Sequence, residues 1–186
     1  MAFAPLVGFA SKKAAQIAAY LLSKQPNMEK LKLIKLLYLS EREFLSRHGH
    51  PMLYDEFYSL KDGPICSSSL NGLNGQLDTE YWAQFFVIGD NKRNFQLKRE
   101  FARDDLDEVS DAEIAAVEGV WERFRDFSAS EIRNWTHDNC PEYTEVESGR
   151  VPISYKDVLD ALGEKNGEDV ERGVSQKRRI SALLSL

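Results

Sequence analysis

The sequence contains only two cysteines, Cys66 and Cys140, among its 186 residues. Two thiols are too few for a disulfide scaffold, and a reducing compartment would keep both of them free. No segment approaches the roughly 20 uninterrupted apolar residues that a membrane span requires. Residues 1–10 also lack the basic segment that precedes the apolar core of a secretory signal. We therefore expect a cytoplasmic protein with no membrane partner.

The motifs of common nucleotide and hydrolase sites are missing as well. A phosphate-binding loop needs glycines at a set spacing followed by a lysine, which Gly72-Leu-Asn-Gly75 does not provide. No Gly-x-Ser-x-Gly nucleophile elbow occurs, and the serines at 67–69 have no histidine near them in sequence. No pair of carboxylates is marked by its spacing or apolar surroundings as an acid–base pair. The sequence therefore predicts no catalytic residues, no cofactor and no enzyme activity.

Histidine is scarce, and its three positions provide one candidate set of metal ligands together with a cysteine. His48 and His50 lie at the end of one expected helix, and His137 with Cys140 at the end of another. Imidazole and thiolate bind zinc, but this spacing matches no zinc module. A histidine at a helix C-terminus is explained by the helix dipole, and a thiol is often just a small buried side chain. We predict no metal site.

Charge is unevenly distributed along the chain, whose formal net charge is −6. Residues 100–147 contain 15 acidic and 4 basic residues, which leaves 15 acidic and 20 basic residues elsewhere. Such a field repels phosphate backbones and can steer a basic protein partner, although a solvated helix face also explains each acidic residue. Lys177-Arg-Arg179 has no interleaved aromatic residues and is typical of a solvated face. Nucleic acid is therefore not an expected partner.

Apolar spacing predicts a mainly α fold, a single helical domain of residues 1–186. Helices are expected over residues 11–24, about 28–48, 110–127, 128–137 and 153–163. The helix at 28–48 has apolar residues well beyond one stripe, so it should be a buried central helix. Expected N-terminal caps are Ser11, Asn27, Ser110 with Glu113 in a capping box, Ser128 to Ser130, and Ser154. Gly49 should end the central helix in the left-handed conformation.

Strand signals are confined to one segment of the chain. β-Favouring residues flank the turn residues at 89–92 and predict a β-hairpin over about 82–99, the only strand pair expected. Residues 52–60 are expected to be extended or irregular, and Pro64 to lie in the first turn of a short helix that extends to residue 71 and is ended by Gly72 and Gly75. Residues 143–152 are expected to form a loop. Residues 164–186 are a C-terminal extension, either a helix or a partly ordered tail.

Five motifs follow one another along the chain: Lys32-Leu-Ile-Lys35-Leu-Leu-Tyr38, Gly49-His-Pro51, Gly63-Pro64, Trp135-Thr-His137 with Cys140-Pro141-Glu-Tyr143, and Ile153-Ser-Tyr-Lys-Asp-Val-Leu159. Together they resemble the Panacea domain, a family of SocA-like antitoxins that includes a phage-associated protein called GepA. The resemblance covers about residues 11–162. The positions that match the family pattern are Lys32, Lys35, Leu36, Leu37, Tyr38, Gly63, Pro64 and His137.

This resemblance implies a mainly helical protein that neutralises a toxin encoded beside it by direct binding. For SocA-like members it also implies a proteolytic adaptor that delivers the toxin to a Clp-type protease. The expected docking surface is the hairpin, with Trp82, Phe85 and Phe86 as exposed anchors, or the acidic helices between 110 and 137. The alternative for these aromatics is that they cover the core.

Tyr38 and His137 are further candidates for partner binding. The ring of Tyr38 suits the core, while its hydroxyl needs a partner, for which His137 and Asp62 are the candidates. Two other functions stay open. One is an enzyme acting on a small molecule or phosphoester through an unrecognised site. The other is a DNA-binding regulator, although residues 51–63 between its two candidate helices exceed the turn of a helix-turn-helix.

Overall fold

The computed structural model describes residues 6–89 and 93–184 of the chain. Within them the fold is mainly α, as predicted, with two small antiparallel sheets. The elements in chain order are α1 (Ser11–Lys24), β1 (Met28–Glu29), α2 (Lys30–His48), β2 (Phe57–Leu60), β3 (Gly63–Cys66), α3 (Ser67–Leu73), α4 (Thr79–Trp82), β4 (Phe86–Ile88), β5 (Asn94–Leu97), the 3-10 turn η1 (Arg103–Asp105), α5 (Asp111–Phe124), α6 (Ala129–Asn139), β6 (Val151–Ile153), α7 (Tyr155–Ala161) and α8 (Gly167–Leu184).

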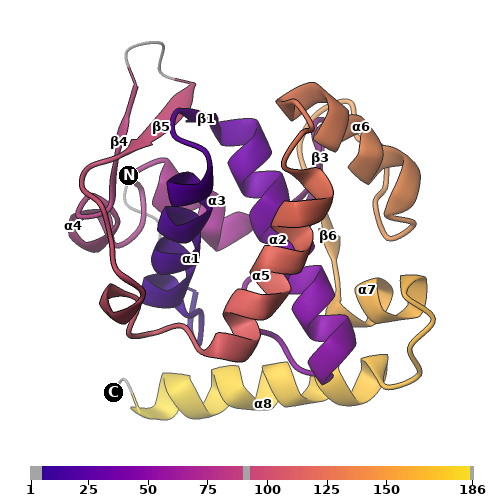
Figure 1. Cartoon of the computed structure of the whole chain (residues 1–186). Coiled ribbons are helices and arrows are strands. Elements are labelled where there is room, and N and C mark those ends of the chain that lie inside the picture. Colours follow the sequence, from indigo (N-terminus) through magenta and orange to yellow (C-terminus); the bar gives the residue numbers. More distant parts are fainter. Residues whose placement is uncertain (1–5, 90–92, 185–186) are drawn as a thin grey trace.

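Helix α2 runs through the middle of the molecule (Figure 1). Twelve of its 19 residues are buried, including every residue from 32 to 41, so it is covered on all sides along that stretch. Its neighbours are α1, α3, α5, α6, α7, β1 and β3. Burial of this much apolar surface is the main stabilising term available to a helix whose own propensity is ordinary.

The two ends of α2 differ from each other in how well the sequence predicts them. Gly49 has φ 69° and ends the helix in the left-handed conformation, as expected. The cap prediction for Asn27 is wrong, because Met28 and Glu29 pair with β5 as strand β1 and the helix begins only at Lys30. Asn27 instead accepts a 3.2 Å hydrogen bond from Gln96.

The predicted hairpin exists, but it is shorter than expected and is joined by a third strand. Strands β4 and β5 pair antiparallel, and β1 adds to the other side of β5. Phe95 is buried while Gln96 is exposed, the alternation expected of a sheet with one face on the core. Residue 82 lies in α4 rather than in a strand. The predicted turn at 89–92 falls largely at 90–92, outside the described residues.

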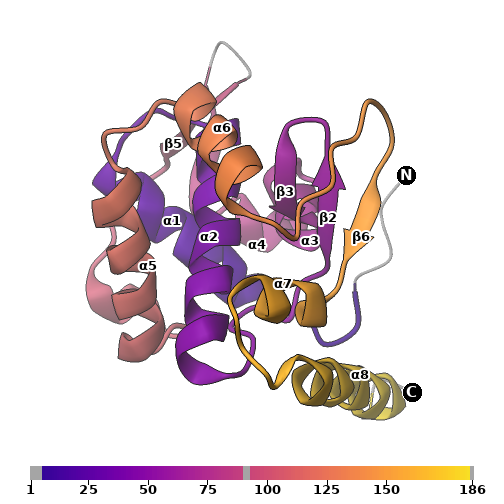
Figure 2. The ribbon, with the colours of Figure 1, turned by 90° about the vertical axis from the view of Figure 1, so that its right-hand side faces the viewer.

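A second sheet, in the order β3-β2-β6, corrects the prediction that the hairpin is the only strand pair. Pro64 lies opposite Ser59 in edge strand β3, so its expected place in the first turn of a helix is wrong. An edge strand tolerates proline because one side of its backbone needs no partner. Val151–Ile153 forms β6 on the opposite edge, where residues 151 and 152 were expected as loop and Ile153 as the start of a helix (Figure 2). Because β2 and β3 separate α2 from α3, these helices do not form a helix-turn-helix.

The predicted helix starts agree better with the structure than the predicted strands do. Ser110, Ser128 and Ser154 cap α5, α6 and α7, as predicted, and each forms a capping box, of which only the one at Ser110 was predicted. The first helix has the predicted bounds, but Ala10 rather than Ser11 occupies its cap position. Helix α3 begins at Ser67 and includes Gly72, so that Gly75, with φ 66°, follows its end.

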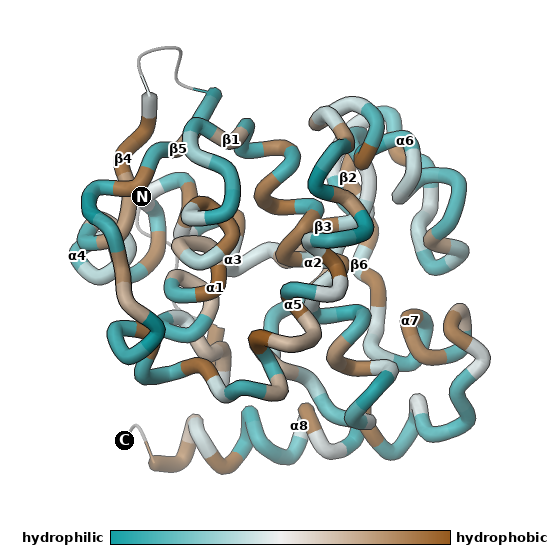
Figure 3. Tube along the Cα trace, in the orientation of Figure 1, coloured by the Kyte–Doolittle hydropathy of each residue, from teal (hydrophilic) through white to brown (hydrophobic). Residues whose placement is uncertain are grey.

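Helix α8 crosses beneath α2 and α5 and is mostly hydrophilic, with separate hydrophobic residues along its length (Figures 1 and 3). Only Gly167, Val170 and Val174 of this helix are buried. In the part of the chain that the structure describes, no helix combines the length and apolar character needed to cross a membrane.

Candidate functional site

The hairpin aromatics are core residues, so the expectation that they are exposed anchors is wrong. Trp82, Phe85 and Phe86 are 1%, 5% and 6% exposed. The Trp82 ring lies against Gly72 so closely that a Cβ there would come within 2.3 Å of it. Its indole N–H donates a 3.1 Å hydrogen bond to Ser11 Oγ. The segment that carries these aromatics therefore folds back onto α1 and α3 and covers the core.

What the hairpin does expose is a pair of aliphatic side chains on β4. Val87 is 41% exposed and Ile88 is 54% exposed. Strand β4 is at the edge of its sheet, next to β5 alone among the described strands. An edge strand with exposed apolar residues is a site at which another chain can pair or pack.

Tyr38 is fully buried and its hydroxyl donates to a different residue from those expected. The phenol donates a 2.6 Å hydrogen bond to Glu142 Oε1, not to His137 or Asp62. Arg42, one helical turn further along α2, donates from Nε to the same oxygen at 2.7 Å. Burial raises the pKa of Tyr38 well above its ordinary value, so the phenol keeps its proton and acts as a donor. The cluster ties α2 to the segment that follows α6.

Four of the residues that match the family pattern meet at a second buried junction, between α2, β3 and α6: Lys35, Gly63, Pro64 and His137. Lys35 Nζ donates a 2.8 Å hydrogen bond to the carbonyl of Pro64. Gly63 has φ +93°, and a Cβ on it would lie 2.8 Å from Lys35 Nζ and 3.0 Å from His137 Cδ2. Thr136 Oγ1 would be equally close at 3.0 Å. Only a glycine leaves room here, which gives the Gly63-Pro64 motif a packing explanation.

Burial changes the pKa values of two residues at this junction. It lowers the pKa of Lys35 to about 7, and it lowers the pKa of His137, with nearby Arg133 and Lys35 acting in the same direction. The His137 ring lies 4.5 Å from the Tyr143 ring, and its Nε2 is buried with no hydrogen-bond partner among the described residues. Lys35 has no exposed surface. Its amine is therefore held inside the protein, away from any substrate in solution.

Two buried carboxylates organise the chain between α2 and α3. Glu41 accepts hydrogen bonds from the backbone N–H groups of Met52 and Leu53, yet burial outweighs these donors and raises its pKa to about 8. Asp55 accepts from the N–H groups of Ser68 and Ser69 in the first turn of α3. Both side chains are fully buried and hold internal backbone groups.

The three histidines and two cysteines are not gathered into one place. His48 and His50 pack on the Phe44 ring, at 4.3 Å and 5.2 Å between ring centres. Cys66 and Cys140 are buried as free thiols, and burial raises the pKa of Cys140 to about 12. Among the described residues, no group of three or more histidine, cysteine or acidic side chains could hold a metal ion.

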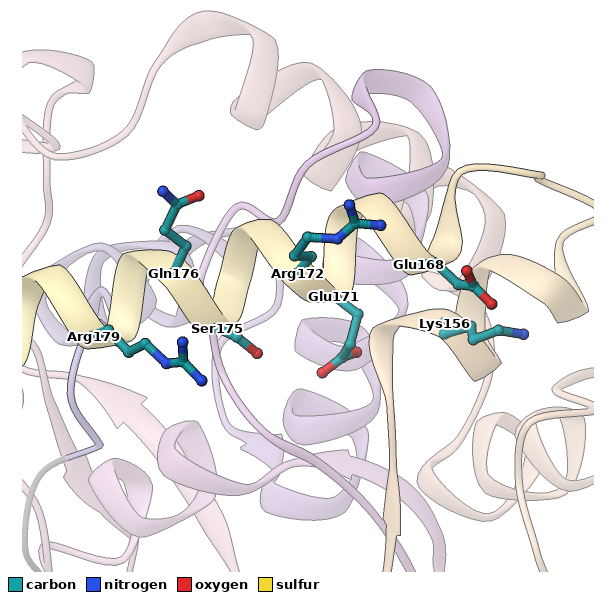
Figure 4. Close-up of a pocket in the computed structure, with 7 residues that line it drawn as sticks. All are labelled: Lys156, Glu168, Glu171, Arg172, Ser175, Gln176 and Arg179. Carbon is teal, nitrogen blue, oxygen red and sulfur yellow. The ribbon is translucent and has the colours of Figure 1, made fainter.

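A hollow of about 600 Å³ lies along α7 and α8. Its side chains lie along the length of the helix and do not converge on one point (Figure 4). They carry both signs of charge, with Lys156 paired to Asp160 and Arg172 paired to Asp169. This arrangement is that of a solvated helix face.

A smaller hollow of about 250 Å³ lies between α2, α5 and α6, and we call it the arginine groove. Its lining residues are Leu39, Arg42, Glu43, Arg47, Gly119, Val120, Arg123, Phe124 and Trp135. The sequence does not predict this groove, because these three helices meet only in the folded protein. The one available signal was that Arg123 is among the 4 basic residues of the acidic segment 100–147.

Comparison with known families places these features in context. Residues 33–142 match the family model described as "Antitoxin SocA-like, Panacea domain". The matched span includes Lys35, Tyr38, Gly63-Pro64, His137 and Glu142, and so contains both buried junctions and the arginine groove. Neither a curated protein nor a solved structure matches the chain.

Proposed function

Because the chain belongs to the Panacea-domain family of SocA-like antitoxins, we propose that it neutralises a protein toxin by binding it directly. The observation that carries this proposal is the family match over residues 33–142. The state of Lys35, Glu41 and Asp55 supports a binding role for this protein over a catalytic one. These groups with displaced pKa values are buried and engaged in internal hydrogen bonds.

The toxin would dock on the outside of the molecule, and two surfaces are suited to it. One is the edge strand β4, where Val87 and Ile88 are exposed and the backbone can accept another strand. The other is the acidic face of α5 and α6, which would attract a basic partner. The buried aromatics Trp82, Phe85 and Phe86 would support the hairpin from within, and Tyr38 and His137 would stabilise the platform without touching the toxin.

Co-expression with the neighbouring open reading frame tests the proposal. If that frame encodes the toxin, its expression alone arrests growth and co-expression of this chain restores it, with the two proteins copurifying. Growth arrest that persists despite abundant folded antitoxin would contradict direct neutralisation of that protein.

The contribution of the hairpin requires surface substitutions. Deletion of residues 82–99 would remove Phe86 and Phe95 from the core, so loss of rescue would report misfolding. Val87→Asp places a charge on the exposed side of β4 instead. Val151→Asp is the matched control, since Val151 is 40% exposed on a strand of the other sheet. We expect Val87→Asp to weaken binding and Val151→Asp to leave it unchanged; equal binding by both variants would exclude the β4 surface.

We also propose, from the family alone, that the antitoxin delivers its toxin to a Clp-type protease in the cytoplasm. The half-life of the toxin, measured with and without this chain in cells with and without the protease, tests this finer proposal. Delivery requires that the antitoxin shorten the half-life only when the protease is active. An unchanged half-life together with restored growth would indicate neutralisation by blocking.

A further inference from the structure

The lining of the arginine groove carries more positive than negative side chains. Arg42, Arg47 and Arg123 line it, with Glu43 as the single acidic residue of the lining. We propose that the groove receives an acidic side chain of the partner protein, which fixes the orientation of the partner on α2, α5 and α6. This inference rests on the proposed function, because it assumes a protein partner.

Arg123 is the residue best placed to hold such a carboxylate. It is exposed, and its guanidinium lies 4.7 Å from the centre of the Trp135 ring and 5.2 Å from that of Phe124. Trp135 is itself held edge-on against Phe124, at 4.8 Å. Stacking on an aromatic face leaves the N–H donors at the guanidinium edge available for a carboxylate. Unlike the other two arginines, Arg123 pairs with no acidic residue in the described chain.

The other two arginines are anchored by carboxylates of the protein itself. Arg42 donates from Nε to Glu142 at 2.7 Å, and Arg47 donates from Nε to Glu43 at the same distance. A guanidinium carries five N–H donors, so each of these groups retains donors beyond those that face its carboxylate. The anchors reduce the side-chain freedom that binding would otherwise remove. Three guanidinium groups are therefore held in place around one small hollow.

The size of the groove and its surroundings limit what can fill it. At about 250 Å³ it is smaller than the roughly 300–1,000 Å³ of typical small-molecule sites. Gly119 lies at its edge, where a Cβ would stand 3.5 Å from an Arg47 nitrogen. The acidic residues of α5 and α6 would repel a nucleic-acid backbone that follows this face. One carboxylate on an otherwise neutral or basic protein surface is small enough for the groove and avoids this repulsion.

The first test uses the toxin and matched arginine variants. Arg123→Gln removes the free guanidinium, and Arg172→Gln removes an exposed arginine of α8 that pairs with Asp169. We expect Arg123→Gln to weaken toxin binding by roughly tenfold or more, Arg172→Gln to leave it unchanged, and both to unfold at the wild-type temperature. Wild-type affinity in folded Arg123→Gln would overturn the inference while leaving the antitoxin proposal intact.

The second test needs no toxin and so separates the two proposals. The side-chain Nε–Hε resonances of the arginines are followed by NMR during titration with acetyl-Glu-Glu-amide, acetyl-Gln-Gln-amide or inorganic phosphate. We expect saturable shifts at Arg42, Arg47 and Arg123 with the acidic dipeptide alone. Shifts with phosphate but not with the acidic dipeptide, or no saturable shift with either, would overturn the inference. Neither result would contradict the antitoxin proposal, because the toxin could still bind at another surface.

Discussion

Tyr38 on α2 donates a 2.6 Å hydrogen bond to Glu142, 104 positions later in the chain. Arg42 donates to the same carboxylate, whose side chain has no exposed surface. A buried carboxylate is stable only when such donors surround it. The hydrogen bonds of Tyr38 and Arg42 to Glu142 therefore hold the segment after α6 against α2, close to the end of the matched family span.

Tyr38→Phe removes one of these donors without creating a cavity. We expect the free energy of unfolding to fall by about 1–3 kcal/mol, because the Glu142 carboxylate loses a buried hydrogen bond while Arg42 still pairs with it. Urea unfolding measures the change. In the control Tyr58→Phe, whose hydroxyl bonds Glu56 at 3.3 Å in a partly exposed place, the change should stay within about 0.5 kcal/mol. Equal stability of the two variants would show that the Glu142 cluster contributes nothing.

Gly63→Ala should be more destabilising than Gly163→Ala, although both glycines have positive φ. Gly163 has φ +79° and open space around it, so its variant pays only the backbone cost of roughly 1–2 kcal/mol. At Gly63, with φ +93°, the new methyl group would also displace Lys35 from Pro64 and press on His137. We expect the additional cost to be about 1 kcal/mol or more, measured by urea unfolding of both variants. Equal losses in the free energy of unfolding would mean that the residues around Gly63 can move to accommodate a methyl group at no cost.

Glu41 should make the protein less stable as the pH rises. Burial raises its pKa from 4.5 to about 8 in the folded state. Between these two values the folded state keeps a proton that the unfolded state has released, so the contribution of Glu41 to stability falls across this window. The free energy of unfolding of Glu41→Gln minus that of wild type should therefore be larger at pH 8 than at pH 5. Glu43→Gln, at a partly exposed position of the same helix, is the control for the loss of one carboxylate.

Lys35 should have the opposite effect at higher pH. Burial lowers its pKa from 10.5 to about 7, so between these values the unfolded state binds a proton that the folded state has released. The contribution of Lys35 to stability therefore rises with pH across this window. We expect the free energy of unfolding of wild type relative to Lys35→Met to increase from pH 7.5 to pH 9.5. A constant difference would indicate that Lys35 keeps its charge inside the protein.

Local signals in the sequence predicted much of the helical fold. The capping boxes at Ser110, Ser128 and Ser154 and the left-handed Gly49 each involve residues within a few positions of one another. The sequence shows such interactions directly, because both partners lie within one helical turn of each other. The errors at Asn27 and Pro64 both come from strand pairing: Met28 and Glu29, next to Asn27, pair with the distant strand β5, and Pro64 pairs with Ser59 in the neighbouring strand β2.

The amino-acid sequence by itself predicted the longer helices α1, α2, α5 and α6, the burial of α2, and the family to which the chain belongs. Tertiary structure alone decided that Trp82, Phe85 and Phe86 turn inward, that Tyr38 meets Glu142, and that Arg42, Arg47 and Arg123 share one groove. Helical periodicity shows that a side chain will be buried, but not which distant residue it will meet. That choice depends on how the helices and strands pack together, and it decides which surface is left for a partner.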